Sequence, residues 1–164
     1  MDRGRYYFAE KEGITYIKMV GNLKYNTSSG FDRFVEGLLE RGFTHAVIDL
    51  SEASYIDSTN LGLIAKIANR SRSCQDVHVS IISPNEDINE ILRSVRFDKI
   101  FNIVTDTSKL DKQALEEIPD ERQGEKENLE MLIKAHKTLM NTHKENRPEF
   151  KDVVELLEQE YEDF

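Results

Sequence analysis

Short apolar runs alternate with segments of helical periodicity along the first two thirds of the chain, and this alternation restricts the possible folds more than any other feature. Residues 5–9 and 14–20 are rich in aromatic and β-branched side chains, as strands are. The connection Glu10–Gly13 carries the glycine that is typical of a hairpin. We therefore expect the first two strands to pair antiparallel.

Three amphipathic segments follow this hairpin, and each precedes a short apolar run. The helical segments are residues 31–39, 61–68 and 88–95, and the runs are residues 46–50, 77–82 and 100–104. Short apolar runs between helices are typical of buried parallel strands, and the last one is expected at a sheet edge. The order ββαβαβαβ predicts a layered α/β domain that ends near residue 110.

The remaining third of the chain predicts a linker and two helices. Residues 111–124 include Pro119 and Gly124 and predict a linker, and residues 125–164 predict a helical hairpin. One helix has its apolar face at Leu129, Leu132, Ile133, His136, Leu139 and Met140, and the other at Phe150, Val153, Val154, Leu157 and Tyr161. Isolated helices of this length are marginal in water, so the stripes should pack on each other or on residues 1–110. The stripe of the second helix could instead serve as a docking surface or swap between two chains, but we favour packing within the chain, with a partner role for the acidic outer face.

Charge and composition narrow the classes of partner. The net charge is −9, and residues 112–164 contribute −7 of it. An acidic tail repels a phosphate backbone, which argues against nucleic acid and favours a basic protein surface. No stretch approaches the ~20 apolar residues of a membrane span, and no signal peptide is evident. With a single cysteine, Cys74, the chain cannot form an internal disulfide, so we expect a cytoplasmic protein with no membrane partner.

A polar loop follows the run at residues 46–50 and ends in Asp57, Ser58 and Thr59, directly before the second predicted helix. These side chains can cap the exposed N–H groups of the helix. The same helix start attracts anions, so a phosphate on Ser58 would be tolerated by the fold while adding about −1.5 to −2 charges to the surface. The residues alone leave both interpretations open, a simple cap or a phosphorylation switch.

Residues 47–62 resemble the STAS family, the domain of anti-sigma factor antagonists. The matching parts are Asp49-Leu50-Ser51 and the stretch from Ile56 to Gly62, with Asn60 where the family usually has glycine. The resemblance implies a STAS-like ββαβαβαβ layered mixed sheet with helices, to which this chain adds its C-terminal hairpin. Residues 126–161 resemble an extra helical segment of some Gram-negative antagonists, which points to motility, biofilm or surface behaviour.

The resemblance also implies roles for individual residues. Ser58 is the expected phosphorylation site, with Thr59 as a minor candidate, and partner binding is expected at Asp57, Ser58, Thr59, Asn60 and Leu61. The implied partner is an anti-sigma factor that is also a serine kinase. It would bind when Ser58 is unphosphorylated and dissociate when Ser58 is phosphorylated, and a serine phosphatase would reverse the modification.

Other functional classes have weaker support in the sequence. The residues also allow a non-switching STAS scaffold or a subunit of a sensor complex. Ser58 is not in a Gly-x-Ser-x-Gly elbow, and no glycine-rich phosphate loop is present, so we expect no enzymatic activity and no cofactor. The four histidines lack the spacing of a zinc signature, so we expect no metal site and assign His136 to packing.

Overall fold

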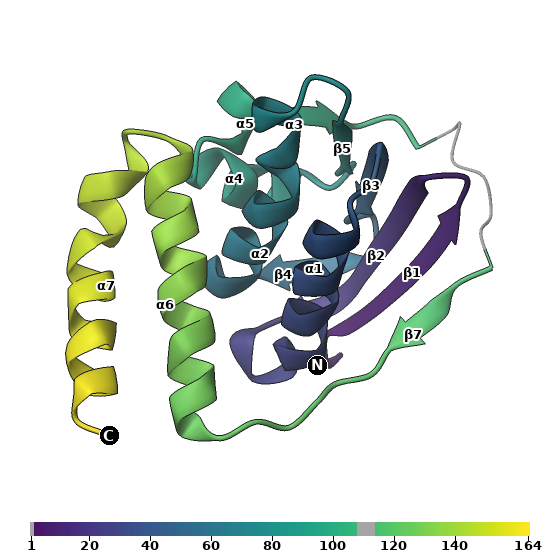
Figure 1. Ribbon diagram of the computed structural model, residues 1–164. Helices are drawn as coiled ribbons and strands as arrows, with labels where there is room; N and C mark the ends of the chain where they lie inside the picture. Colours follow the sequence, from purple (N-terminus) through teal and green to yellow (C-terminus); the bar gives the residue numbers. More distant parts are fainter. Residues whose placement is uncertain (1, 108–113) are drawn as a thin grey trace.

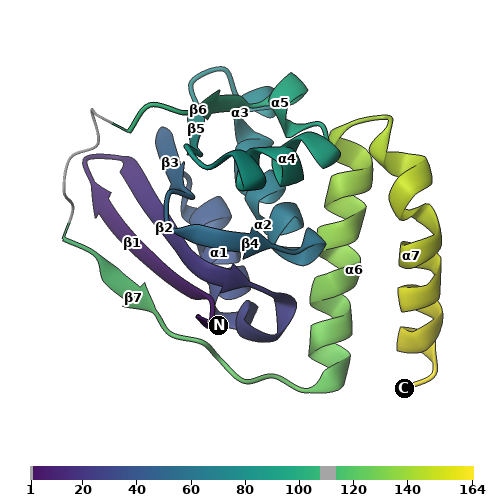
Figure 2. The ribbon, with the colours of Figure 1, turned by 180° about the vertical axis from the view of Figure 1, so that it is seen from behind.

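A mixed sheet carries helices on one face and a helical hairpin at its side (Figures 1 and 2). The computed structural model describes residues 2–107 and 114–164. Within these residues, seven strands form the sheet in the order β6-β5-β3-β2-β1-β7, and β4 pairs with β2 off this path. The strands are β1 (Arg5–Lys11), β2 (Ile14–Leu23), β3 (His45–Asp49), β4 (Ala53–Ile56), β5 (His78–Ile82), β6 (Asn102–Val104) and β7 (Glu116–Ile118).

Helix α1 lies in front of the strands in Figure 1 and behind them in Figure 2, so it covers one face of the sheet. The helices are the 3-10 turn η1 (Tyr25–Thr27), α1 (Ser29–Arg41), α2 (Ser58–Ala68), α3 (Arg70–Ser73), α4 (Glu86–Ser94), α5 (Phe97–Ile100), α6 (Glu125–Thr142) and α7 (Asn146–Glu162). Among the described residues, no helix is both long enough and apolar enough to cross a bilayer.

The predicted α/β alternation is confirmed. β1 and β2 pair antiparallel, whereas β2, β3, β5 and β6 are parallel neighbours, as right-handed crossovers through helices require. Strand β6 lies at an edge, as expected. The core is formed by apolar side chains of the strands and of α1, α2 and α4, among them Ile17, Ile48, Val35, Leu63 and Leu92.

Two strands were not predicted. β4 lies in the segment that we interpreted as a polar loop, and β7 lies in the predicted linker, residues 111–124. The linker prediction therefore needs correction, because residues 116–118 pair antiparallel with β1 and extend the sheet. Residues 111–113 of the predicted linker and the predicted domain end near residue 110 lie outside the described residues. Both missed strands have only three or four residues, too few to show a periodicity.

The C-terminal hairpin forms as predicted, with α6 and α7 side by side (Figure 1). The His136 and Phe150 rings meet edge to face at 5.9 Å, and the Tyr161 hydroxyl donates to Glu130 at 2.6 Å. One detail of the predicted stripe is wrong, since Val154 is buried whereas Val153 exposes 39% of its surface. Helix α7 rests mainly on α6, so only a narrow face of it is covered.

The turn of the hairpin is attached to the end of α4. Asn146 is fully buried and donates to the backbone carbonyls of Val95 and Leu139, both at 3.0 Å. Arg96, which has a left-handed backbone with φ 62°, pairs with Glu145 and Glu149. The hairpin is therefore anchored at its turn by buried hydrogen bonds and surface ion pairs together.

Replacing Asn146 should loosen this anchor. Asn146→Ala leaves two buried carbonyl groups without their donors, so we expect a loss of about 1–3 kcal/mol in unfolding free energy. Asn141→Ala is the matched control, because Asn141 is an exposed residue of the same hairpin. Urea titration of both variants measures the difference, and equal midpoints would contradict the anchoring role of Asn146.

Candidate functional site

The start of α2 is set by β4 and the residue that follows it. β4 pairs with the end of β2, where Gly21 has φ 82° and a Cβ would lie 2.9 Å from the carbonyl oxygen of Arg3. Gly21 is therefore needed for this close approach. The N–H of Asp57 then donates to the carbonyl of Leu23 at 2.9 Å, which fixes where α2 begins relative to the sheet.

Asp57 is the N-cap of α2. Its Oδ1 accepts the N–H of Asn60 at 2.9 Å, and its Oδ2 accepts the N–H of Tyr25 at 2.7 Å. One carboxylate thus joins α2 to η1. The predicted capping role is confirmed for Asp57, but the structure gives no such role to Ser58 or Thr59, which are the first two residues of the helix itself.

The structure gives a reason for asparagine at position 60, where the family usually has glycine. Its side chain is fully buried and accepts from the Tyr6 hydroxyl, while its amide donates to Ser28 Oγ and Asp57 Oδ1, both at 2.9 Å. Ser28 in turn donates to the carbonyl of Lys24 at 2.7 Å. Burial raises the pKa of the Tyr6 phenol, so it stays a neutral donor. Each buried polar group here has its partner.

Ser58 contacts the C-terminal hairpin. Its Oγ lies 2.7 Å from Nε2 of His136 on α6, although the two residues are 78 positions apart. The other ring nitrogen of His136, Nδ1, lies 2.6 Å from the carbonyl oxygen of Leu132. A carbonyl can only accept, so Nδ1 carries a proton, and in the neutral ring Nε2 is the acceptor for the Ser58 hydroxyl.

His136 is held neutral by its surroundings. Only 5% of its surface is exposed, and this burial lowers the pKa of the imidazole, while the Leu132 carbonyl and the charge of Asp57 act in the opposite direction. The packing role predicted for His136 is confirmed by its contact with Phe150. Its bond to Ser58 was missed, because the sequence shows only a histidine among the apolar positions of a helix.

The five residues expected to bind a partner differ in their accessibility. Asp57 and Ser58 are partly exposed, whereas Thr59 and Leu61 are 3% exposed and Asn60 is not exposed at all. As the chain is folded here, a partner could therefore touch only the very start of α2. The expected roles of Thr59, Asn60 and Leu61 in partner binding remain a prediction.

Helix α6 covers the rest of α2, and it lies beside α2 in both views (Figures 1 and 2). The two helices approach closely at Gly62, where a Cβ would lie 2.3 Å from the carbonyl oxygen of Ala135. Beyond the end of α2, Arg72 donates to the carbonyl of Thr142 at 2.7 Å. The contact thus extends along the whole of α2, and glycine at position 62 lets the two backbones meet.

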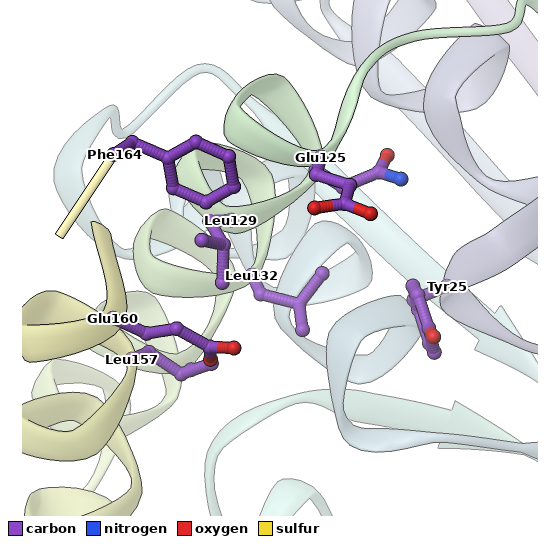
Figure 3. A pocket seen from close by; sticks show the side chains of 8 residues that line it. Tyr25, Glu125, Leu129, Leu132, Leu157, Glu160 and Phe164 are labelled. Atoms are coloured by element: carbon purple, nitrogen blue, oxygen red, sulfur yellow. The ribbon is translucent and has the colours of Figure 1, made fainter.

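A groove remains open where the hairpin ends, opposite its turn. It has a volume of about 380 Å³ and lies between η1, the start of α6 and the end of α7 (Figure 3). Tyr25, Leu132 and Leu157 are among the side chains that line it. The described residues hold no group of three or more His, Cys, Asp or Glu that could bind a metal ion. The groove therefore marks incomplete packing between hairpin and domain.

The family of the chain follows from its sequence. Residues 8–110 match the STAS domain, which is more than half of the chain. The chain belongs to the STAS domain family. The matched region begins within β1 and extends past β6, with Asp57, Ser58 and all of α2 inside it, whereas β7 and the hairpin lie beyond it. No relative was found among curated protein sequences.

Solved structures share the fold of this STAS domain. One is an anti-sigma factor antagonist from Mycobacterium paratuberculosis, with 15% identity, a TM-score of 0.53, and coverage of 61% of this chain and 84% of that one. Another is a putative anti-sigma factor antagonist from Thermotoga maritima, with 24% identity, a TM-score of 0.53, and coverage of 62% and 87%. At these identities the likeness extends to the fold.

The buried cluster around Asn60 should be energetically coupled. Asn60→Gly restores the residue usual in the family but deprives the buried Tyr6 hydroxyl of an acceptor, so we expect a loss of about 1–3 kcal/mol in unfolding free energy. Tyr6→Phe removes the hydroxyl itself. In the double variant the loss should be clearly smaller than the sum of the single losses, as measured by a double-mutant cycle in urea. Simple additivity would contradict the coupling.

The neutral state of His136 predicts a pH dependence. Its folded-state pKa lies below the ordinary value of 6.5, so the unfolded chain binds the proton more readily. The stability from a neutral His136 is therefore complete above pH 6.5 and is lost as the pH falls toward the folded pKa. His136→Gln, which keeps an acceptor for Ser58, should show a smaller loss of unfolding free energy between pH 7 and pH 5. Equal losses in both proteins would contradict this assignment.

Proposed function

We propose that this protein is an anti-sigma factor antagonist in a partner-switching pathway. It binds an anti-sigma factor that is also a serine kinase while Ser58 is unphosphorylated. Phosphorylation of Ser58 releases that partner, and a serine phosphatase restores the binding form. STAS family membership and two neighbours of the same fold, one described as an anti-sigma factor antagonist and the other as a putative one, support this role.

The observation that carries the proposal is the position of Ser58. It is the first residue of α2, partly exposed, and directly follows the Asp57 cap that fixes the helix start. A phosphate there would lie at the positive end of the helix dipole, which favours an anion by about 0.3–1 kcal/mol at an exposed site. The domain would keep its fold while the charge of the surface changes. A partner that buries the hydroxyl would have to desolvate the phosphate or meet it with like charge.

The first test asks whether Ser58 is the modified residue. Wild-type protein incubated with an extract of its host cells and ATP should gain the mass of one phosphate, and Ser58→Ala should gain none. Thr59→Ala is the control, and it should be modified like the wild type. Full modification of Ser58→Ala would place the site elsewhere and remove the basis of the switch.

The second test asks whether charge at Ser58 abolishes binding. Ser58→Asp should lose at least about tenfold in affinity for the co-purified kinase, which is ~1.4 kcal/mol. Ser54→Asp adds the same charge at an exposed serine of β4 and should bind like the wild type. Calorimetry and circular dichroism measure binding and fold. Phosphorylation of Ser58 without any change of affinity would instead favour a non-switching scaffold or a sensor-complex subunit.

A further inference from the structure

We propose that α6 is a displaceable, intramolecular occupant of the partner-binding surface on α2, so that the C-terminal hairpin must detach before a kinase can reach Ser58. This inference rests on the proposed function, because it describes how the same site is regulated. The relevant surface is the face of α2 that begins at Ser58 and continues through Gly62 to Asn69.

Contacts at three levels show that α6 occupies this surface. At the start of α2, the Ser58 hydroxyl is bonded to His136. In the middle, Gly62 meets the backbone of Ala135. Just past the end, Asn69 donates to the Thr142 hydroxyl at 3.3 Å. No partner could lie along α2 while these contacts persist.

The Ser58 contact also prevents phosphoryl transfer. A kinase must bring the γ-phosphate in line with the attacking oxygen and remove its proton through a base of its own. Here that proton is donated to Nε2 of His136, whose ring is almost completely buried between α2 and α7. The side of Ser58 that faces α6 therefore has no space for a nucleotide, and the hydroxyl becomes available only when His136 moves away.

The way the hairpin is attached permits this movement. Its turn is held at the end of α4 by Asn146 and by the two ion pairs of Arg96. The start of α6 and the end of α7 border the open groove beside Tyr25, whose backbone N–H binds the Asp57 cap next to Ser58. The segment before α6 is attached as well, since Asp120 pairs with Arg3 and Glu121 with Arg33. We therefore expect α6 to open as a cover that lifts off α2 while it stays tethered at both ends.

The composition of α2 explains why a helix packs over it. Every residue of α2 except Ser58 and Lys66 is buried, so the helix is covered on all sides. A helix that is apolar all round is stable only when both its faces are packed. If α6 leaves, another protein surface must take its place, and the hairpin and the partner therefore compete for the same face of α2.

The test uses the full-length chain and needs no kinase. In a Cys74→Ser background, which removes the exposed native thiol, Ser58→Cys reports the accessibility of position 58 through its rate of alkylation by iodoacetamide. Adding Ala135→Arg forces a long side chain against Gly62 and should raise this rate about tenfold, since the rate follows the open fraction. Gln159→Arg adds the same charge at an exposed position of α7 and should leave the rate unchanged.

Alkylation that is equally fast with and without Ala135→Arg would overturn the proposal. Circular dichroism establishes that the variants are folded, and the unmodified protein provides a second measurement should Ala135→Arg fail to fold. Under native conditions, amide hydrogens of α6 and α7 should exchange through a local opening, at rates well above those of β3 in the core. If α6 exchanges only by global unfolding, at the rate of β3, then α6 does not detach separately from the core. That result would overturn the proposal.

These results are separable from the proposed function. Alkylation and hydrogen exchange involve no partner, so they measure the detachment of α6 from α2 even if Ser58 is never phosphorylated. Conversely, Ser58 could be phosphorylated as rapidly in wild type as in Ala135→Arg. That result would support the phosphorylation switch and contradict the proposal that α6 blocks access to Ser58. If both proposals hold, Ala135→Arg should be phosphorylated faster than the wild type and should bind the kinase more tightly, while Gln159→Arg should match the wild type.

Discussion

The structure depends on the burial of α2 from both sides. This helix lies between the sheet and α6, and its residues from Thr59 to Ala68 are almost all buried. A STAS domain without further helices would leave one face of such a helix exposed to solvent, at a cost of about 25 cal/mol for each Å² of apolar surface. In this chain the hairpin covers that face. The same packing that stabilises the protein thus determines which surface is available to a partner.

A second constraint keeps the start of α2 in place. Asp57 joins η1 to α2 through one carboxylate, and Asn60 connects it to Tyr6 on β1. Because Tyr6, Ser28 and Asn60 are buried and paired, removal of one leaves others unsatisfied, and the cluster acts as a unit. This rigidity holds Ser58 at the first position of α2. It also gives Asn60 a structural role where the family usually has glycine.

The hairpin shows how an acidic appendage can become part of a site. Its surface carries most of the net charge of the chain, but the residues that meet α2 are small or neutral, as with Ala135, His136 and Thr142. Ion pairs join the hairpin to the domain at the turn, around Arg96, and just before α6, where Asp120 pairs with Arg3 and Glu121 with Arg33. Surface ion pairs contribute little each, whereas the buried bonds of Asn146 contribute more. The hairpin is therefore held at its turn and before α6, and the contact of α6 with Ser58 lies between these two attachments.

The sequence by itself determined the alternation of helices and strands, the cap at Asp57, the position of Ser58 at a helix start and the existence of the hairpin. These features follow from local periodicity and capping chemistry, which operate over a few residues. It did not reveal β4 or β7, because strands of three or four residues show no period and exist only through their neighbours in the sheet.

Only the tertiary structure decided what the hairpin packs against. The apolar stripe of α6 is equally compatible with α7, with the sheet or with a second chain, since hydrophobic burial is non-directional. The choice of α2 depends on Gly62, whose missing side chain admits the backbone of Ala135 and brings His136 to Ser58 across 78 positions. Close packing of this kind is a property of two surfaces together, so neither segment of the sequence reveals it alone.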